Sequence, residues 1–199
     1  MRSLRFASGF ATLAALAACS TPPAPPAPPA AIPAYLQANT GCAILAGGAV
    51  GSQFTDRQVE ATWNKINTAV TNELHDRLVA NKYRTVKLIV PGERALEVHK
   101  LVFESAAANR CSRVLQVAHK VDEDTKGKYF LFDVSLYRAV PKPDAKPTPA
   151  GLSITTAGEY QRAYRYPRTE ESFRNFYTGD FAEKVLADLT ASGALAPLR

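Results

Sequence analysis

The sequence predicts an α+β domain of two layers, in which helices pack on one face of a mostly antiparallel sheet. Two stretches have apolar residues three or four positions apart, and two others alternate about a polar turn that ends in glycine. The elements follow the order helix, strand, helix, strand, strand, strand, helix, which is typical of this class. With 46% hydrophobic and 21% charged residues among 199, the chain can build a core.

The first long helix begins at Thr55, which with Gln58 forms a predicted capping box. Its apolar positions recur on one helical face, and the helix is expected to end near Asn81; they are Val59, Trp63, Ile66, Val70, Leu74 and Leu78. Residues 93–109 predict a second helix, whose apolar residues include Leu96, Leu101, Val102 and Phe103.

The strands are predicted from alternation. A short apolar run at 42–45 predicts a strand at an edge of the sheet, and 86–90 alternates up to Pro91-Gly92. Residues 113–121 and 128–140 predict a hairpin about a polar turn at 122–127, and 152–166 predicts the last strand.

The last helix is expected to begin at Thr169, as its N-cap, and to end before Gly193. Gly179 and Asp180 are expected to break or restart it. Its apolar residues are Phe173, Phe176, Tyr177, Phe181, Val185, Leu186 and Leu189.

Residues 1–18 have the pattern of a secretory signal peptide. Arg2 and Arg5 precede an apolar stretch at 6–18, which is too short to span a membrane. The stretch ends in Leu16-Ala17-Ala18-Cys19, which resembles the lipobox of bacterial lipoproteins. The resemblance implies diacylation of the Cys19 thiol, cleavage before it and palmitate-type anchoring in a membrane, whereas an ordinary export signal is the alternative. Ser20 at the next position implies sorting to the outer membrane, facing the periplasm.

A Pro/Ala-rich tether is predicted at 19–34, after the lipidated cysteine. Its prolines exclude a helix or a central strand and favour extended polyproline II. The fourteen residues of 21–34 reach roughly 40 Å when extended, which predicts a semi-rigid spacer, although a linker of no required length is the alternative. The remaining residues, 35–199, are predicted to form one domain, with a Pro-rich surface loop at 141–149.

The order of elements over about 55–195 is similar to that of small helix-on-sheet domains of periplasmic lipoproteins. Examples are the N-terminal domain of the Tol-system propeller protein, the curli-export lipoprotein and the lipoprotein activators of penicillin-binding proteins. The resemblance is one of topology, and it implies a domain that binds partners and carries no catalysis. It transfers no functional residue.

Cys42 and Cys111 form an even pair in an oxidising compartment, so the sequence predicts a disulfide between them, with two free thiols as the alternative. The bond would close a loop of about 70 residues and stabilise the domain by at most about 4 kcal/mol. A redox centre is disfavoured because such cysteines usually lie two residues apart.

Other catalytic or metal-binding signals are weak. The histidines, His75, His99 and His119, lack the spacing of zinc ligands, and the chain has neither a nucleophile elbow nor a phosphate-binding glycine loop. The sequence therefore predicts no cofactor, no metal and no enzymatic activity. Asp133 lies among apolar neighbours, but its parity with Tyr129, Leu131 and Ser135 predicts an exposed position on the outer face of the hairpin.

A run of tyrosines and arginines in the last predicted strand is the candidate partner surface. Tyr and Arg are the side chains that most often carry binding energy at interfaces. The candidate residues are Tyr160, Arg162, Tyr164, Tyr166 and Arg168. The alternative is a strand face half-covered by the last helix, with arginine stems lying over aromatic rings.

These observations predict a periplasm-facing lipoprotein that serves as a non-catalytic adaptor of an envelope complex. A structural lipoprotein that binds peptidoglycan or another anionic envelope polymer is the second hypothesis, and a hydrolase or transferase with an unrecognised site is the third. Nucleic acid is disfavoured, because removal of Arg2 and Arg5 with the signal peptide lowers the formal net charge of +6 by two units.

Overall fold

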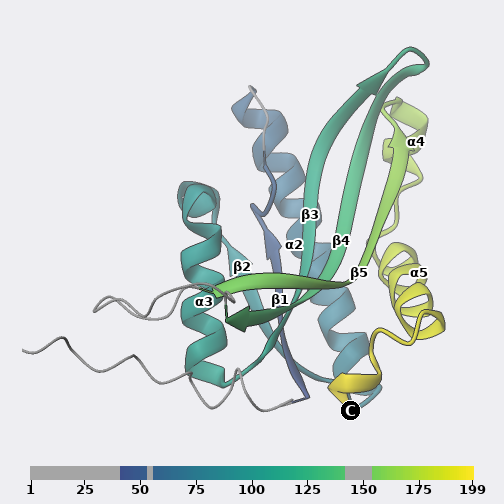
Figure 1. Ribbon diagram of the computed structural model, residues 1–199. Helices are drawn as coiled ribbons and strands as arrows, with labels where there is room; N and C mark the ends of the chain where they lie inside the picture. Colours follow the sequence, from purple (N-terminus) through teal and green to yellow (C-terminus); the bar gives the residue numbers. More distant parts are fainter. Residues whose placement is uncertain (1–40, 53–55, 142–153) are drawn as a thin grey trace, which may run out of the picture.

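The computed structural model describes residues 41–52, 56–141 and 154–199, and it confirms the α+β class (Figure 1). A mixed five-stranded sheet has the strand order β2-β1-β3-β4-β5. The elements, with η for 3₁₀ helices, are β1 (Cys42–Gly48), α2 (Arg57–Ala80), β2 (Arg84–Val90), η1 (Gly92–Glu97), α3 (Val98–Asn109), β3 (Arg113–Asp124), β4 (Gly127–Pro141), β5 (Ile154–Pro167), α4 (Glu170–Arg174), α5 (Thr178–Ala191) and η2 (Ala196–Leu198).

Several sequence-based predictions fall outside these residues. They are the signal peptide at 1–18, the lipobox with Cys19, the tether at 19–34 and most of the Pro-rich loop at 141–149. Among the described residues, none of the helices is both long and apolar enough to cross a membrane.

The helices lie on both faces of the sheet, which corrects the prediction of helices on one face only. β1 pairs in parallel with β2 on one side and with β3 on the other. The connection through α2 therefore moves across the sheet in one direction and the connection through α3 in the opposite direction. Because such connections are almost always right-handed, the two helices come to lie on opposite faces.

Strand β1 lies between two neighbours and is buried along its whole length, so the prediction of an edge strand at 42–45 was wrong. Ala43 and Leu45 contact the core under α2 and α5, whereas Ile44 and Ala46 face α3. A strand covered on both faces is a continuous apolar run, and this is why alternation could not reveal its place.

The N-cap of α2 is Asp56 and not Thr55, which corrects the predicted capping box. The Asp56 carboxylate accepts hydrogen bonds from the amides of Gln58 and Val59. The helix ends at Asn81, as predicted. Its predicted apolar face packs on the sheet together with α5, and the fully buried members of this main core include Val70, Leu74, Leu78, Leu115, Phe132, Leu136 and Leu189.

Helix α2 approaches β1 closely through Gly47, where any Cβ would overlap the Thr71 hydroxyl. Next to it, the side-chain amide of the buried Asn67 donates to the carbonyls of Gly48 (2.8 Å) and Val117 (2.9 Å). The same amide nitrogen lies 2.9 Å from Nδ1 of His119. These contacts satisfy polar groups in the middle of the core, where an unpaired group would be costly.

The antiparallel half of the sheet is longer than the parallel half. β3 runs on past its pairing with β1, turns at 125–126 and returns as β4, so the predicted hairpin is confirmed with a tighter turn (Figure 1). β5 completes the sheet and is followed by α4 and α5. Thr169 caps α4 as predicted, but the chain is non-helical at 175–177 and restarts at Thr178.

The predicted disulfide between Cys42 and Cys111 is present, with Cα atoms 4.7 Å apart. It joins the start of β1 to the segment between α3 and β3. Both cysteines are buried with Ile44 and Ala106, under the end of α3.

Candidate binding groove on the open sheet face

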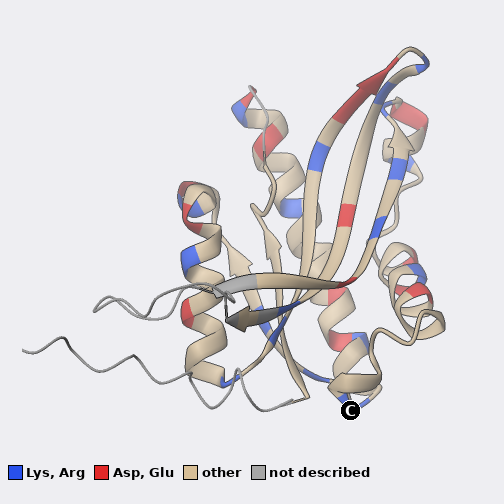
Figure 2. Ribbon diagram, viewed as in Figure 1, with Lys and Arg blue, Asp and Glu red and all other residues tan. Residues whose placement is uncertain are grey.

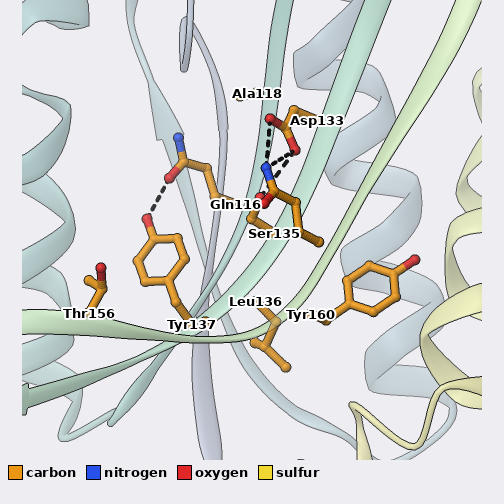
Figure 3. Close-up of a pocket in the computed structure, with 10 residues that line it drawn as sticks. Gln116, Ala118, Asp133, Ser135, Leu136, Tyr137, Thr156 and Tyr160 are labelled. Atoms are coloured by element: carbon orange, nitrogen blue, oxygen red, sulfur yellow. Dashed lines mark hydrogen bonds between the residues drawn. The ribbon is translucent and has the colours of Figure 1, made fainter.

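A shallow hollow of about 450 Å³ lies on the antiparallel half of the sheet, mainly on the face turned away from α2 and α5. We call it the open-face groove. Figure 3 shows the residues that line it, which are Gln116, Ala118, Asp133, Ser135, Leu136, Tyr137, Thr156, Gly158, Tyr160 and Gln161.

Cross-strand register brings the polar lining together. Gln116 of β3 is paired with Ser135 of β4, which is paired with Gln161 of β5. The next row holds Ala118 and Asp133. Residues directly opposite one another on adjacent strands lie on the same face, so amide, hydroxyl and carboxylate groups converge over a small alanine.

Asp133 is the charged centre of the groove. Its carboxylate accepts hydrogen bonds from Lys120 Nζ (3.3 Å), Ser135 Oγ (3.2 Å) and Gln161 Nε2 (3.3 Å). The side chain is on the outer face, as its parity predicted, but only 17% of it is exposed, which corrects the expectation of an exposed carboxylate. Its oxygens are held by neighbouring donors rather than offered to bulk water.

Tyr137 stands on the other side of the groove and donates its hydroxyl hydrogen to Oε1 of Gln116 (Figure 3). Burial raises the pKa of Tyr137 to about 12, so the phenol stays neutral in the physiological range. The ring also packs against the cluster beneath α3. Tyr137 therefore forms a fixed wall with a neutral polar tip.

A β-bulge shapes the groove. Leu136 is paired with Tyr160 and Tyr137 with Gly158, which leaves Glu159 as the extra residue of β5. Bulges bend the strand that contains them, and Figure 1 shows β5 turning across the sheet near this point. A Cβ at Gly158 would have no atom within 4 Å, so this position contributes open space.

The bulge is held from the opposite face by an ion pair. Arg113 is almost completely buried and donates from Nε and Nη2 to the two carboxylate oxygens of Glu159, at 2.7 and 3.1 Å. Two parallel hydrogen bonds of this kind fix orientation as well as distance. Arg113 thus positions the residue around which β5 bends.

The predicted Tyr/Arg surface lies largely beneath α5. Tyr164 is buried and donates its hydroxyl hydrogen to Asp188 of α5 (2.8 Å), and burial is the main cause that raises its pKa. Arg162 pairs with the same carboxylate at 2.8 Å. This is the arrangement of the alternative, a strand face half-covered by the last helix.

Tyr160 joins this contact, because its hydroxyl lies 3.3 Å from the hydroxyl of Tyr164, whereas Tyr166 and Arg168 contact other groups. Tyr160 packs at the margin of the main core, and the Tyr166 ring meets Phe176 edge-on at 5.3 Å. Arg168 lies near the hairpin, where its guanidinium is 5.6 Å from the centre of the Phe130 ring. The structure therefore does not bring the five residues into one exposed patch.

The histidines are also apart from one another. His75 is on α2 and His99 is on α3. His119, on β3, is buried on the face of the sheet that α2 covers, beside Asn67. In the ranges that the structure describes, no three His, Cys, Asp or Glu side chains are grouped as ligands of a metal ion.

The groove residues that sequence reasoning missed include Gln116, Tyr137 and Gln161. Strand alternation could have placed them on the outer face of their strands. It could not show that this half of the sheet leaves that face accessible, because that depends on the direction of the crossover through α3.

No family model matches the chain, and no curated protein matches it. The functional assignment therefore depends on the chemistry of the groove and of the N-terminal sequence.

Proposed function

We propose that this chain is a lipoprotein of the periplasmic face of the outer membrane, anchored through Cys19, which acts as a non-catalytic adaptor of an envelope complex. Its partner is a periplasmic protein, which binds in the open-face groove. The observation that carries this proposal is the accessible polar hollow on the outer face of β3, β4 and β5.

The Cys42–Cys111 disulfide supports an exported location. Disulfides persist in the periplasm and are rare in the reducing cytosol. Here the bond joins the start of β1, the first described strand, to the segment between α3 and β3.

The chemistry of the groove favours binding over proton transfer. A catalytic carboxylate needs a free oxygen near the substrate, and Asp133 has its oxygens occupied by Lys120, Ser135 and Gln161. Tyr137 is likewise engaged with Gln116. A network of satisfied polar groups on a rigid sheet suits a surface that forms hydrogen bonds to a partner.

Charge on this face favours a protein over an anionic polymer. Lys120 pairs with Asp133, and Arg165 pairs with Asp122 (3.1 Å) and Asp124 (2.7 Å). The positive groups beside the groove are thus balanced by carboxylates. An anionic glycan would have to displace these pairs, whereas a polar protein surface would not.

Filling the groove tests this function. Gly158→Val adds a side chain into open space on a strand, where a β-branched residue is favoured, so the fold is expected to persist. A photo-crosslinking residue at Ala163, the cross-strand partner of Asp133, should trap a periplasmic protein in cells. We expect Gly158→Val to lower the yield of that adduct about tenfold, which corresponds to about 1.4 kcal/mol.

The matched control is Ala108→Val, which enlarges an exposed residue of α3 and should leave the yield unchanged. A crosslinker placed at Ala108 should trap no such protein. If the Ala163 adduct is peptidoglycan, which sediments with sacculi, the polymer-binding hypothesis replaces the adaptor. An unchanged yield in Gly158→Val would exclude the groove as the partner site.

The anchor is tested separately with Cys19→Ser. The unchanged protein should incorporate labelled palmitate and sediment with outer membranes, because two or three acyl chains hold a protein on a bilayer almost irreversibly. Cys19→Ser should lose the label and accumulate uncleaved. Absence of palmitate from the unchanged protein would contradict the anchored location.

A further inference from the structure

Strand β2 is an open edge of the sheet. It pairs with β1 along its whole length, and no other described strand pairs with its opposite side (Figure 1). The segment Arg84–Val90 is rich in β-branched and apolar residues, and its pairing has no bulge. The other edge strand, β5, is bent by its bulge, which is a device that protects an edge from further pairing. Of the two edges, β2 is therefore the better template for an added strand.

Three residues of β2 direct their backbone groups outward. The Val90 carbonyl accepts a hydrogen bond from the amide of Ala49, at 2.8 Å, so it points toward β1. In a strand the backbone polar groups of successive residues point alternately to the two sides. Thr85, Lys87 and Ile89 therefore present their N–H and C=O groups on the open side, where no described residue bonds to them. An antiparallel strand would exchange two hydrogen bonds with each of the three.

A shallow hollow of about 310 Å³ lies between this edge and α2. Its lining includes Lys65 and Ala69 of α2, and Ile89 and Pro91 at the end of β2. The Ile89 side chain is on the face that α2 covers, because its register partner in β1 is the glycine that α2 approaches closely. Side chains opposite one another on adjacent strands share a face, so the residue of an added strand that lies opposite Ile89 would enter the hollow.

Lys87 is the charged side chain that an added strand would meet directly on this face. Neither Lys87 nor Lys65 forms an ion pair with any described residue. Asp76, three turns beyond Lys65 on the same side of α2, and Glu93, which follows the hollow, are exposed and leave both lysines unpaired. By contrast, the two arginines in the middle of β5 are paired with carboxylates (Figure 2). A carboxylate opposite Lys87 would stabilise an added strand, and a second cation would destabilise it.

These features disfavour a second copy and the preceding chain as the occupant. If two β2 strands paired antiparallel over all their residues, Lys87 would face its own counterpart, and like charges directly opposite are destabilising. The described part of the chain begins at Gly41, where a Cβ would lie 3.1 Å from the carbonyl oxygen of Pro197 and 3.5 Å from that of Arg199. This point is at the start of β1, whereas the hollow lies at the end of the parallel β2.

We propose that β2 binds an extended segment of a partner protein as a further, antiparallel strand of the sheet. The segment places an apolar side chain opposite Ile89, in the hollow, and two residues later a carboxylate opposite Lys87. Main-chain hydrogen bonds give strand addition its affinity, and alternate side chains give it specificity. The site is separated from the open-face groove by β1, and it depends on neither the groove nor the anchor.

Amide exchange of the full chain, followed residue by residue by NMR, tests the pairing. The probe is a peptide with blocked ends, Ser-Thr-Thr-Leu-Thr-Glu-Thr-Ser, whose leucine and glutamate are two residues apart. We expect it to slow exchange of the amides of Thr85, Lys87 and Ile89 at least about tenfold. The amides of Val86 and Leu88, which point toward β1, should change much less. Absence of this alternation would overturn the strand addition.

Charge reversal tests the carboxylate position. Lys87→Glu should weaken binding of the peptide about fivefold, because a cross-strand pair of opposite charge becomes one of like charge. A peptide with lysine in place of its glutamate should bind Lys87→Glu about as tightly as the original peptide binds the unchanged protein. The matched control, Lys126→Glu in the hairpin turn, changes net charge equally and should leave both affinities unaltered. If the unchanged protein binds both peptides equally, the role of Lys87 is wrong.

Filling the hollow tests the apolar position. Ala69→Leu adds a larger side chain at the lining of the hollow and should weaken binding about tenfold. Its control is Ala187→Leu, which makes the same change at an exposed position of α5 and should have no effect. Equal affinities of the two variants would exclude the hollow from the site.

The free protein reveals any other occupant. If the three outward amides are protected without peptide and the protection rises with protein concentration, a second copy covers the edge and the proposal is overturned. Protection that is independent of concentration would assign the edge to a segment of this chain and would also overturn it. Neither result bears on the groove or the anchor, which the Gly158→Val and Cys19→Ser variants test separately.

Discussion

Buried polar residues specify how α2 sits on the sheet. Asn67 and His119 lie in the middle of an otherwise apolar interface, and each is almost inaccessible to solvent. The Asn67 amide nitrogen has two hydrogens and faces three acceptors, the carbonyls of Gly48 and Val117 and Nδ1 of His119, so one hydrogen is shared between two of them. An Nδ1 that faces this donor carries no proton, which requires the neutral imidazole. Any rotation of α2 would break this bond and those to Gly48 and Val117.

The neutral His119 makes stability depend on pH. Burial lowers the pKa of His119 from 6.5 to about 4. The unfolded chain therefore binds a proton at His119 below pH 6.5, whereas the folded chain binds it only near pH 4. The contribution of the neutral His119 to the free energy of unfolding is complete above pH 6.5 and is lost as the pH falls to 4. We expect His119 to account for about 3 kcal/mol of the decrease in unfolding free energy over that interval.

Urea denaturation at several pH values measures this effect. His119→Gln keeps an acceptor for Asn67 but cannot titrate, so its unfolding free energy should fall less steeply with acid than that of the unchanged protein. Equal slopes in the two proteins would show that another group is responsible.

At the scale of elements, the bulge of β5 and its ion pair connect the core to the groove. Arg113 is on the inner face of the sheet, and Glu159 is the residue that the bulge inserts. The pair thus lies on one face of the sheet, while the bend that it stabilises shapes the open-face groove on the other face. Loss of one partner should affect both stability and binding.

Glu159→Leu leaves the buried Arg113 without its carboxylate, which we expect to lower the unfolding free energy by about 3 kcal/mol. The double variant Arg113→Met with Glu159→Leu removes the stranded charge and should recover most of that loss. Urea denaturation measures both changes. If the double variant loses as much stability as the sum of the losses in Glu159→Leu and in Arg113→Met alone, the pair is not coupled and this interpretation fails.

Local sequence patterns predicted most of the helices and strands. The spacing of apolar residues placed α2, alternation about 122–127 placed the hairpin, and Thr169 and Gly193 marked helix ends, with Gly193 at φ 74°. Each of these depends on a few neighbouring residues, which is why one chain is sufficient to find them.

Features that depend on distant segments were missed. A break in the last helix was expected at Gly179 and Asp180, but its place at 175–177, where the Phe176 ring stacks on Phe132 at 5.4 Å, was not. The groove depends on the bulge at Glu159 and on which face α3 covers. The Tyr/Arg strand was predicted as a repeated pattern, but only the fold shows that Asp188 of α5 lies against it.

At the scale of the whole molecule, the sheet has two unequal parts. The parallel part lies between α2 and α3, and the Cys42–Cys111 disulfide joins β1 to the segment before β3. The end of the β3–β4 hairpin extends beyond β1 and has fewer buried neighbours (Figure 1). Local openings should therefore concentrate at the hairpin end.

Native-state hydrogen exchange should show this difference directly. We expect the amides of β1 to exchange only through global unfolding, whereas those of 122–128 exchange at least about a hundredfold faster through local opening. Uniform protection of both segments would mean that the hairpin is integrated in one cooperative unit with the rest of the sheet.

The neighbouring positions of Gly41 and Arg199 also bear on how the domain could be rearranged. A connection of a few residues could join these two points, and the chain could then be opened at the polar turn of 125–126 instead. Such a circular permutant would keep every strand pairing, and its new ends would lie at the turn between β3 and β4. The position at which a tether attaches to the domain could therefore be moved to the hairpin turn without changing the fold.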